Sequence, residues 1–181
     1  MNLKREKPFT RRMLRQPHRY PHAYKIQRNL YGILAMATSL DAIEETLLER
    51  RKLPNKTGPI PSYPHPEGVV ADYAQLLEEY LIETAVFVRG HDDFWKAKEG
   101  SGWSKVLTRK CGTSRYVKGD PGETDLTLRA ACDKIIHHTQ FDCGRSEDRF
   151  VVFLWGAKQS REWCAELQVE EFCWIGLTYV K

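Results

Sequence analysis

The feature that most constrains the fold is a pair of long amphipathic segments separated by a proline-rich stretch. Between residues 23 and 51, apolar side chains recur at steps of three and four residues, the pattern of a helix with one buried face. A second such pattern covers residues 67–91, and five prolines lie between Pro54 and Pro66. Prolines interrupt regular structure, so the simplest arrangement is two long helices packed antiparallel.

The rest of the chain predicts a third helix and a β-hairpin. Residues 124–138 carry a helical pattern after two good capping residues, and the β-branched and aromatic run from Arg149 is followed by a looser alternation up to residue 169. Glycines between residues 96 and 123 predict a loop-rich insert with a short helix at 103–109. Residues 170–180 favour a helix, with a strand as the alternative.

The predicted fold is therefore mainly α, an antiparallel helical bundle with a small C-terminal β-hairpin at about 149–169, which makes it an α+β chain. Residues 1–22 form a basic arm that contains proline, and residues 23–181 form a single helical domain. The chain has 181 residues, of which 41% are hydrophobic, enough for one packed core.

Composition also bounds the location of the chain. No run of about 18 apolar residues predicts a membrane-spanning helix, and the first residues lack the apolar region of a signal peptide, so we expect a soluble protein without membrane contact. Five cysteines, an odd number without a CxxC pair, favour a reducing, cytoplasmic compartment and buried free thiols. A zinc site would have to use His137, His138, Cys143 and Cys164, whose spacing is not that of structural zinc sites, and we therefore expect no metal and no cofactor.

Positive charge is concentrated at the N-terminus. Residues 1–28 hold nine basic side chains and one acid, giving +8, whereas the other 153 residues carry −4. A basic arm of this kind can follow the phosphates of a nucleic acid, and the arginines we assign to such binding are Arg5, Arg11, Arg12, Arg15 and Arg19. The alternative is an extension packed against the acidic surface of the chain's own domain.

One group of residues on the third predicted helix has the composition of a catalytic site. Asp133 and His137 are four residues apart and share a helix face, so the carboxylate can orient the imidazole. Arg129 lies on a broadly common side and can hold a phosphate. Together they would suit acid–base cleavage of a phosphodiester, and the alternative is an ordinary polar helix face with a salt bridge.

The stretch from Cys132 to His137 resembles the HEPN superfamily of helical proteins, in which an arginine and a later histidine form an RNA-cleaving or nucleotide-binding site. The polar position of the family motif falls on Asp133 and its histidine on His137. Cys132 occupies the place of the family's arginine, and Arg129 is the nearby substitute. Over residues 23–140, the resemblance implies a HEPN-like domain with a metal-independent ribonuclease or RNA-binding function, and a homodimer.

Two classes of function stay open at this point. The first is RNA or nucleotide binding, with or without RNA cleavage. The second is a non-enzymatic protein–protein interaction or scaffold domain that uses tryptophans as core or interface anchors, namely Trp95, Trp103, Trp155, Trp163 and Trp174. The chain carries no Walker A loop, GxGxxG or HExxH motif, which argues against the corresponding nucleotide and zinc chemistries. Exposure of His137 in a cleft near Arg129 would favour the first class.

Overall fold

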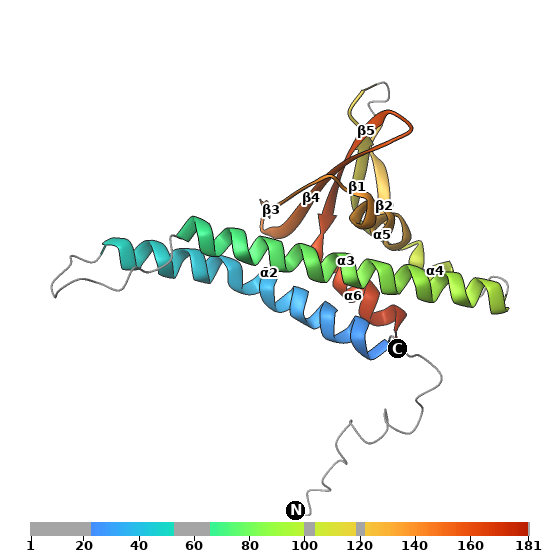
Figure 1. Ribbon diagram of the computed structural model, residues 1–181, viewed down its shortest axis with the longest axis horizontal. Helices are drawn as coiled ribbons and strands as arrows, with labels where there is room; N and C mark the ends of the chain where they lie inside the picture. The colour runs from blue at the N-terminus through green and yellow to red at the C-terminus, as the bar shows by residue number, and fades with distance from the viewer. Residues whose placement is uncertain (1–22, 53–65, 100–103, 119–121, 181) are drawn as a thin grey trace, which may run out of the picture.

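Two long antiparallel helices form the base of the molecule (Figure 1). The computed structural model describes residues 23–52, 66–99, 104–118 and 122–180. Helix α2 (Ala23–Lys52) and helix α3 (Pro66–Glu99) pack along one another, which confirms the predicted pair. Helix α3 continues past Gly90, because the next turn buries His91 and Asp92 and thereby offsets the helix cost of a glycine.

A five-stranded antiparallel sheet stands on these helices, in the order β2-β1-β5-β4-β3. The prediction of a helical bundle with only a small hairpin is therefore wrong, and the chain has an α+β fold with a full sheet. The strands are β1 (Lys110–Tyr116), β2 (Thr124–Thr127), β3 (Gln140–Ser146), β4 (Arg149–Lys158) and β5 (Arg161–Gln168). Strands β4 and β5 are the predicted hairpin, and Gln159 and Ser160 have the positive φ angles that a tight hairpin turn requires.

Three strands were missed because their local signals are weak. Strand β1 is polar and contains Gly112, and its partner β5 lies about fifty residues later in the chain. Strand β2 occupies the four residues taken as the start of the third helix. Strand β3 turns into β4 at Glu147, which adopts a positive φ without being a glycine. The interval 96–123 therefore contains the end of α3, the short helix α4 (Ser104–Leu107) and β1.

Helices α5 (Leu128–His137) and α6 (Val169–Tyr179) join the sheet to the long helices. Helix α5 packs against α3 and strands β1, β2 and β4, whereas α6 packs against α2, β1 and β4. Buried residues of these elements form one core, in which Phe172, Leu154 and Leu30 are fully enclosed. In the part of the chain described, no helix combines the length and apolar composition needed to cross a bilayer.

A close backbone approach joins β1 to β5. A Cβ atom added at Gly112 would lie 2.1 Å from the carbonyl oxygen of Glu166, so the backbone would have to move to admit any side chain. The register of β1 with β2 shifts between Lys110 and Thr113, next to this glycine. Gly112 is therefore required for the pairing that holds β1 in the sheet.

We expect Gly112→Ala to lower the free energy of unfolding by about 1–3 kcal/mol, because the added methyl group forces the two strands apart. Gly144→Ala, on β3, is the matched control, since nothing lies within 4 Å of its added Cβ. Chemical denaturation of both variants measures the difference. Equal stability of the two variants would contradict the assigned β1–β5 contact.

Candidate functional site

Helix α5 carries the predicted catalytic residues, and three sides of it have three different environments. Its N-terminus is capped by Thr127, whose hydroxyl accepts a hydrogen bond from the backbone N–H of Ala130 at 3.3 Å. The apolar side enters the core through Leu128, Ala131, Cys132 and Ile135. The polar residues divide between a side that contacts α3 and a side that lines an open pocket.

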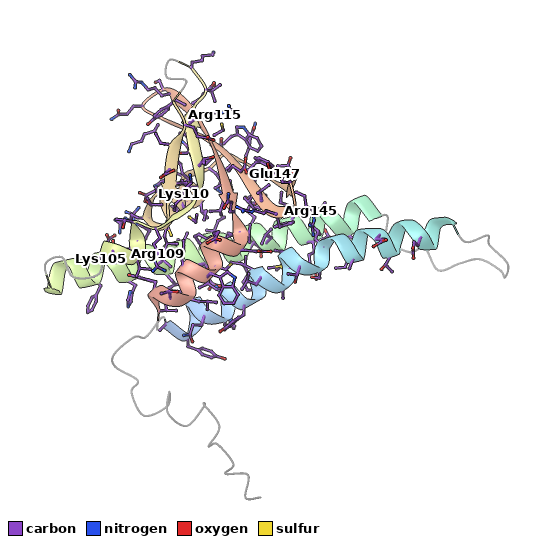
Figure 2. All side chains as sticks on the ribbon, turned by 180° about the vertical axis from the view of Figure 1, so that it is seen from behind. Lys105, Arg109, Lys110, Arg115, Arg145 and Glu147 are labelled. Atoms are coloured by element: carbon purple, nitrogen blue, oxygen red, sulfur yellow. The ribbon has the colours of Figure 1, made fainter. Side chains whose placement is uncertain are left out.

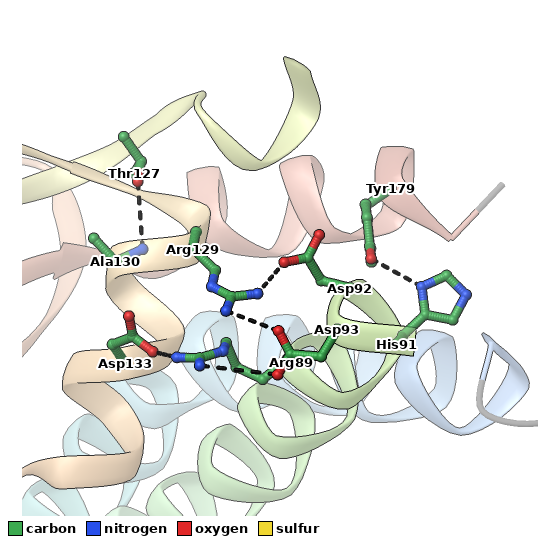
Figure 3. A network of polar contacts seen from close by, with 9 residues as sticks. All are labelled: Arg89, His91, Asp92, Asp93, Thr127, Arg129, Ala130, Asp133 and Tyr179. Carbon is green, nitrogen blue, oxygen red and sulfur yellow. Dashed lines mark hydrogen bonds and ion pairs between the residues drawn. The ribbon is translucent and has the colours of Figure 1, made fainter. Parts of the chain in front are cut away.

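Arg129 and Asp133 face α3, where both form ion pairs (Figure 3). One arm of the Arg129 guanidinium contacts Asp92, and Nη2 donates to Asp93 Oδ1 at 2.9 Å. Asp133 pairs with Arg89, which also lies 4.0 Å from Asp93. The Asp92 side chain is only 1% exposed, so Arg129 brings a cation to a buried carboxylate.

The two histidines at the end of α5 differ in environment. His137 is exposed, and it is one of the residues that line the pocket beside α5. The His138 side chain is 7% exposed, and its ring nitrogens lie 2.6 Å from the carbonyl oxygen of Ile135 and 2.7 Å from Glu78 Oε1. His138 therefore ties the end of α5 to α3.

The structure does not bring the three predicted catalytic residues together. Among the described contacts, no hydrogen bond or ion pair joins His137 to Asp133 or Arg129, because both of these residues are bound to α3. His137 is exposed in a cleft, as a binding site would require, but the cations that line this cleft include Lys134 and Lys158 and not Arg129. Arg129 holds two helices together and does not reach the pocket lining.

We expect Arg129→Gln to destabilise the fold by about 3 kcal/mol or more, since it removes the charged partner that Arg129 brings to the buried carboxylate of Asp92. Arg149→Gln is the control, because Arg149 is exposed and, among the described residues, its side chain donates to Gln168 alone, at 3.2 Å. Thermal and denaturant unfolding measure both changes. An Arg129→Gln variant as stable as the control would contradict this structural role.

The pocket beside α5 is open and has a volume of about 780 Å³. It lies between α5 and the ends of β1, β4 and β5, close to the C-terminus of the helix. The residues that matter most for its chemistry are Lys134 and His137 from α5, Lys158 from β4, Tyr116 and Ser114 from β1, and Trp163 from β5. We call this cavity the Lys134–Lys158 pocket.

Two lysines dominate the charge of the Lys134–Lys158 pocket. Of the other charged residues that line it, Arg89 and Asp133 neutralise one another, and the Nε atom of Arg115 donates to Cys164 Sγ at 3.4 Å. No described residue forms an ion pair with Lys134 or Lys158. The pocket thus has a positive potential that an anion can neutralise.

Lys134 is held above aromatic rings at the pocket wall. Its ammonium lies 3.7 Å from the ring centroid of Trp163 and 5.8 Å from that of Tyr116. Gly156, opposite Trp163 in the sheet, leaves room for the indole, because a Cβ there would lie 2.3 Å from the ring. Burial is the larger cause and the positive charge of Lys158 the smaller cause that together lower the pKa of Lys134 to about 8.

Because the pKa of Lys134 lies below its ordinary value of 10.5, the unfolded chain binds this proton more tightly than the folded chain. The contribution of Lys134 to the free energy of unfolding therefore rises between about pH 8 and pH 10.5 and is lowest below pH 8. We expect Lys134→Met to remove this rise and to increase the melting temperature at pH 7 by about 2–4 °C. The control is Lys105→Met, at an exposed position of α4, and unchanged pH dependence in Lys134→Met would contradict the assignment.

Hydroxyl groups and aromatic rings complete the wall of the Lys134–Lys158 pocket. The side-chain oxygens of Ser114 and Thr124 lie 3.1 Å apart at its edge. Ammonium and hydroxyl groups donate hydrogen bonds to phosphate oxygens, and Tyr116 offers a ring for stacking. The exposed imidazole of His137 can exchange protons with a ligand bound there.

The other predictions concern the basic arm, the cysteines and a zinc site. The five arginines of the basic arm lie outside the described residues. All five cysteines are unpaired, and Cys111, Cys132 and Cys173 are buried, as expected. The zinc set is not assembled, since His138 is bound to Glu78 and Cys164 to Arg115; in the part of the chain described, no group of three or more potential ligands could hold a metal ion.

Comparisons with family models, with curated proteins and with solved structures find no match to this chain. The resemblance of residues 132–137 to the HEPN motif therefore stays a prediction that rests on those residues.

Sequence reasoning did not identify the two lysines that line the pocket as candidate site residues. Lys134 stands three residues before His137, so the helical spacing already placed both on one side of α5. Lys158 gave no such signal, because only the sheet brings the end of β4 beside α5. Trp163 was recognised as an anchor, but its contact with a lysine depends on the same tertiary packing.

Proposed function

We propose that this protein binds RNA or a nucleotide in the Lys134–Lys158 pocket. The observation that carries the proposal is the pair of lysines beside an exposed histidine and two aromatic rings, Tyr116 and Trp163. The ammonium groups hold a phosphate, and the ring of Tyr116 stacks with a base. Arg129, first assigned as the phosphate clamp, is replaced in this role by Lys134.

Metal-independent RNA cleavage is the catalytic form of this proposal. His137 is the acid–base group, in keeping with the HEPN resemblance of residues 132–137. Asp133 does not orient it, because its carboxylate is bound to Arg89. Lys134 and Lys158 would stabilise the negative charge that develops on the phosphate during cleavage.

The basic arm and the cellular setting belong to the same proposal. Arg5, Arg11, Arg12, Arg15 and Arg19 would add contacts to RNA phosphates, which makes affinity depend steeply on salt. The five unpaired cysteines support a cytoplasmic location. A homodimer would bring two copies of α5 and two pockets to one RNA.

A second candidate is a protein-interaction or scaffold domain. It is favoured by large apolar side chains on the helices that stay exposed, namely Tyr24 and Tyr31 on α2, Phe94 on α3 and Trp174 on α6. Trp174 is the exposed anchor that this function would use first, at 59% exposure.

The deciding experiment uses a fluorescein-labelled uridine octamer in EDTA, with binding measured by anisotropy and cleavage by gel. We expect Lys158→Ala to weaken binding about tenfold, the equivalent of about 1.4 kcal/mol for a lost charge-assisted contact. We expect His137→Ala to bind normally and to slow any cleavage by about 10²–10⁴-fold. Lys105→Ala is the control, because Lys105 lies on α4 and does not line the pocket.

The pH dependence gives a second readout of the same binding. Affinity should fall as the pH rises above about 8, because Lys134 then loses the proton that makes it attract phosphate. Failure of the wild-type protein to bind the octamer at low salt would overturn the proposed function. Binding without cleavage would remove only the catalytic form.

A further inference from the structure

A second hollow lies on the face of the sheet that points away from the core. Its volume is about 330 Å³, and no described helix contributes a residue to its lining. Phe153 and Trp155 supply its aromatic walls, since they alternate along β4 with the core residues Val152 and Leu154. Their ring centroids are 6.1 Å apart, and both side chains are half-buried. We call this cavity the Phe153–Trp155 hollow.

The strand register places polar groups directly beside the two rings. Glu166 of β5 is paired with Phe153 on one side and with Thr113 on the other. In the next row, Cys164 lies between Trp155 and Arg115. Side chains opposite one another in an antiparallel sheet are about 5 Å apart, so a carboxylate and a guanidinium flank the aromatic pair.

The carboxylate of Glu166 is open to a ligand. Among the described residues, no hydrogen bond or ion pair engages it, although it lines the hollow. Arg115, whose Nε donates to Cys164 at 3.4 Å, lies toward the end of β1 that is farther from the long helices (Figure 2). The hollow is therefore lined by two carboxylates, Glu166 and Glu123, by one cation, Arg115, and by two aromatic rings, and Glu166 is the carboxylate that the register places beside those rings.

This combination suits one nucleobase better than the others. Any base can stack on an aromatic ring, so Phe153 and Trp155 do not discriminate. An ionised carboxylate only accepts hydrogen bonds, and guanine alone presents two adjacent N–H donors, N1–H and N2–H, on its Watson–Crick edge. Adenine and cytosine place a ring-nitrogen acceptor beside their amino group, and uracil places carbonyl oxygens on both sides of its N–H.

We propose that the Phe153–Trp155 hollow binds a guanine base of single-stranded RNA, with Glu166 accepting from N1–H and N2–H. Ser114 and Arg115 line both this hollow and the Lys134–Lys158 pocket, so one RNA strand passes from one cavity to the other across the end of β1. Arg115 stands at this crossing, where it offsets the charge of the backbone. The inference rests on the proposed function and names single-stranded, guanine-containing RNA as its substrate class.

The test compares three heptamers at low salt by fluorescence anisotropy: uridine throughout, one central guanosine, and one central adenosine. We expect the guanosine heptamer to bind about tenfold more tightly than the adenosine one, within the range for a bidentate contact. Glu166→Gln should bring this ratio close to one, because its amide replaces one acceptor by a donor. Glu162→Gln is the matched control, since Glu162 lies on the same strand outside the hollow.

A second variant tests stacking separately from hydrogen bonding. Phe153→Ala should weaken binding of the guanosine heptamer about tenfold. Bound RNA should also quench the fluorescence of Trp155 less in this variant than in the wild-type protein. Equal affinity for the guanosine and adenosine heptamers would overturn the guanine site, and the proposed function would stand if Lys158→Ala weakened both. The guanine site would also be overturned if a lysine octapeptide bound in place of RNA and lost its affinity for the Glu166→Gln variant. Absence of binding to all three heptamers would refute both proposals.

Discussion

The ion pairs between α3 and α5 are the interaction on which the rest of the site depends. Arg129 and Asp133 reach across to Asp92, Asp93 and Arg89, while the opposite side of α5 is buried in the core. A short helix held on two sides cannot rotate, so its third side is fixed toward the sheet. The charges that resembled catalytic groups thus act as the support that positions Lys134 and His137.

Lys134 shows the cost of holding a charged group in a partly buried position. The folded chain holds an ammonium over Trp163 and near a second lysine, where burial and repulsion both favour its neutral form. Such an arrangement lowers stability, and under the proposed function a phosphate between the two lysines would relieve their repulsion. A residue that weakens the fold in this way is typical of a functional position.

The elements that the sequence predicts are those held by interactions between residues close together in the chain. Helices α2 and α3 and the β4–β5 hairpin were predictable, because periodicity and a tight turn act over a few neighbouring residues. Strand β1 was not, since its partner Leu167 is remote from Gly112 in the chain and its own residues are polar. Strand β2 was hidden by its helix-capping threonines and aspartate, of which Thr127 alone serves as the cap.

The sequence by itself determined that α5 would be amphipathic, with His137 on a polar side, and that the chain would hold two long helices and a hairpin. Only the tertiary structure decided which charged residues face one another. Arg129 found its partners on α3, and Lys158 came to lie beside Lys134 through the sheet. Spacing along one helix gives the direction of a side chain, whereas a site is made from elements whose contacts arise on folding.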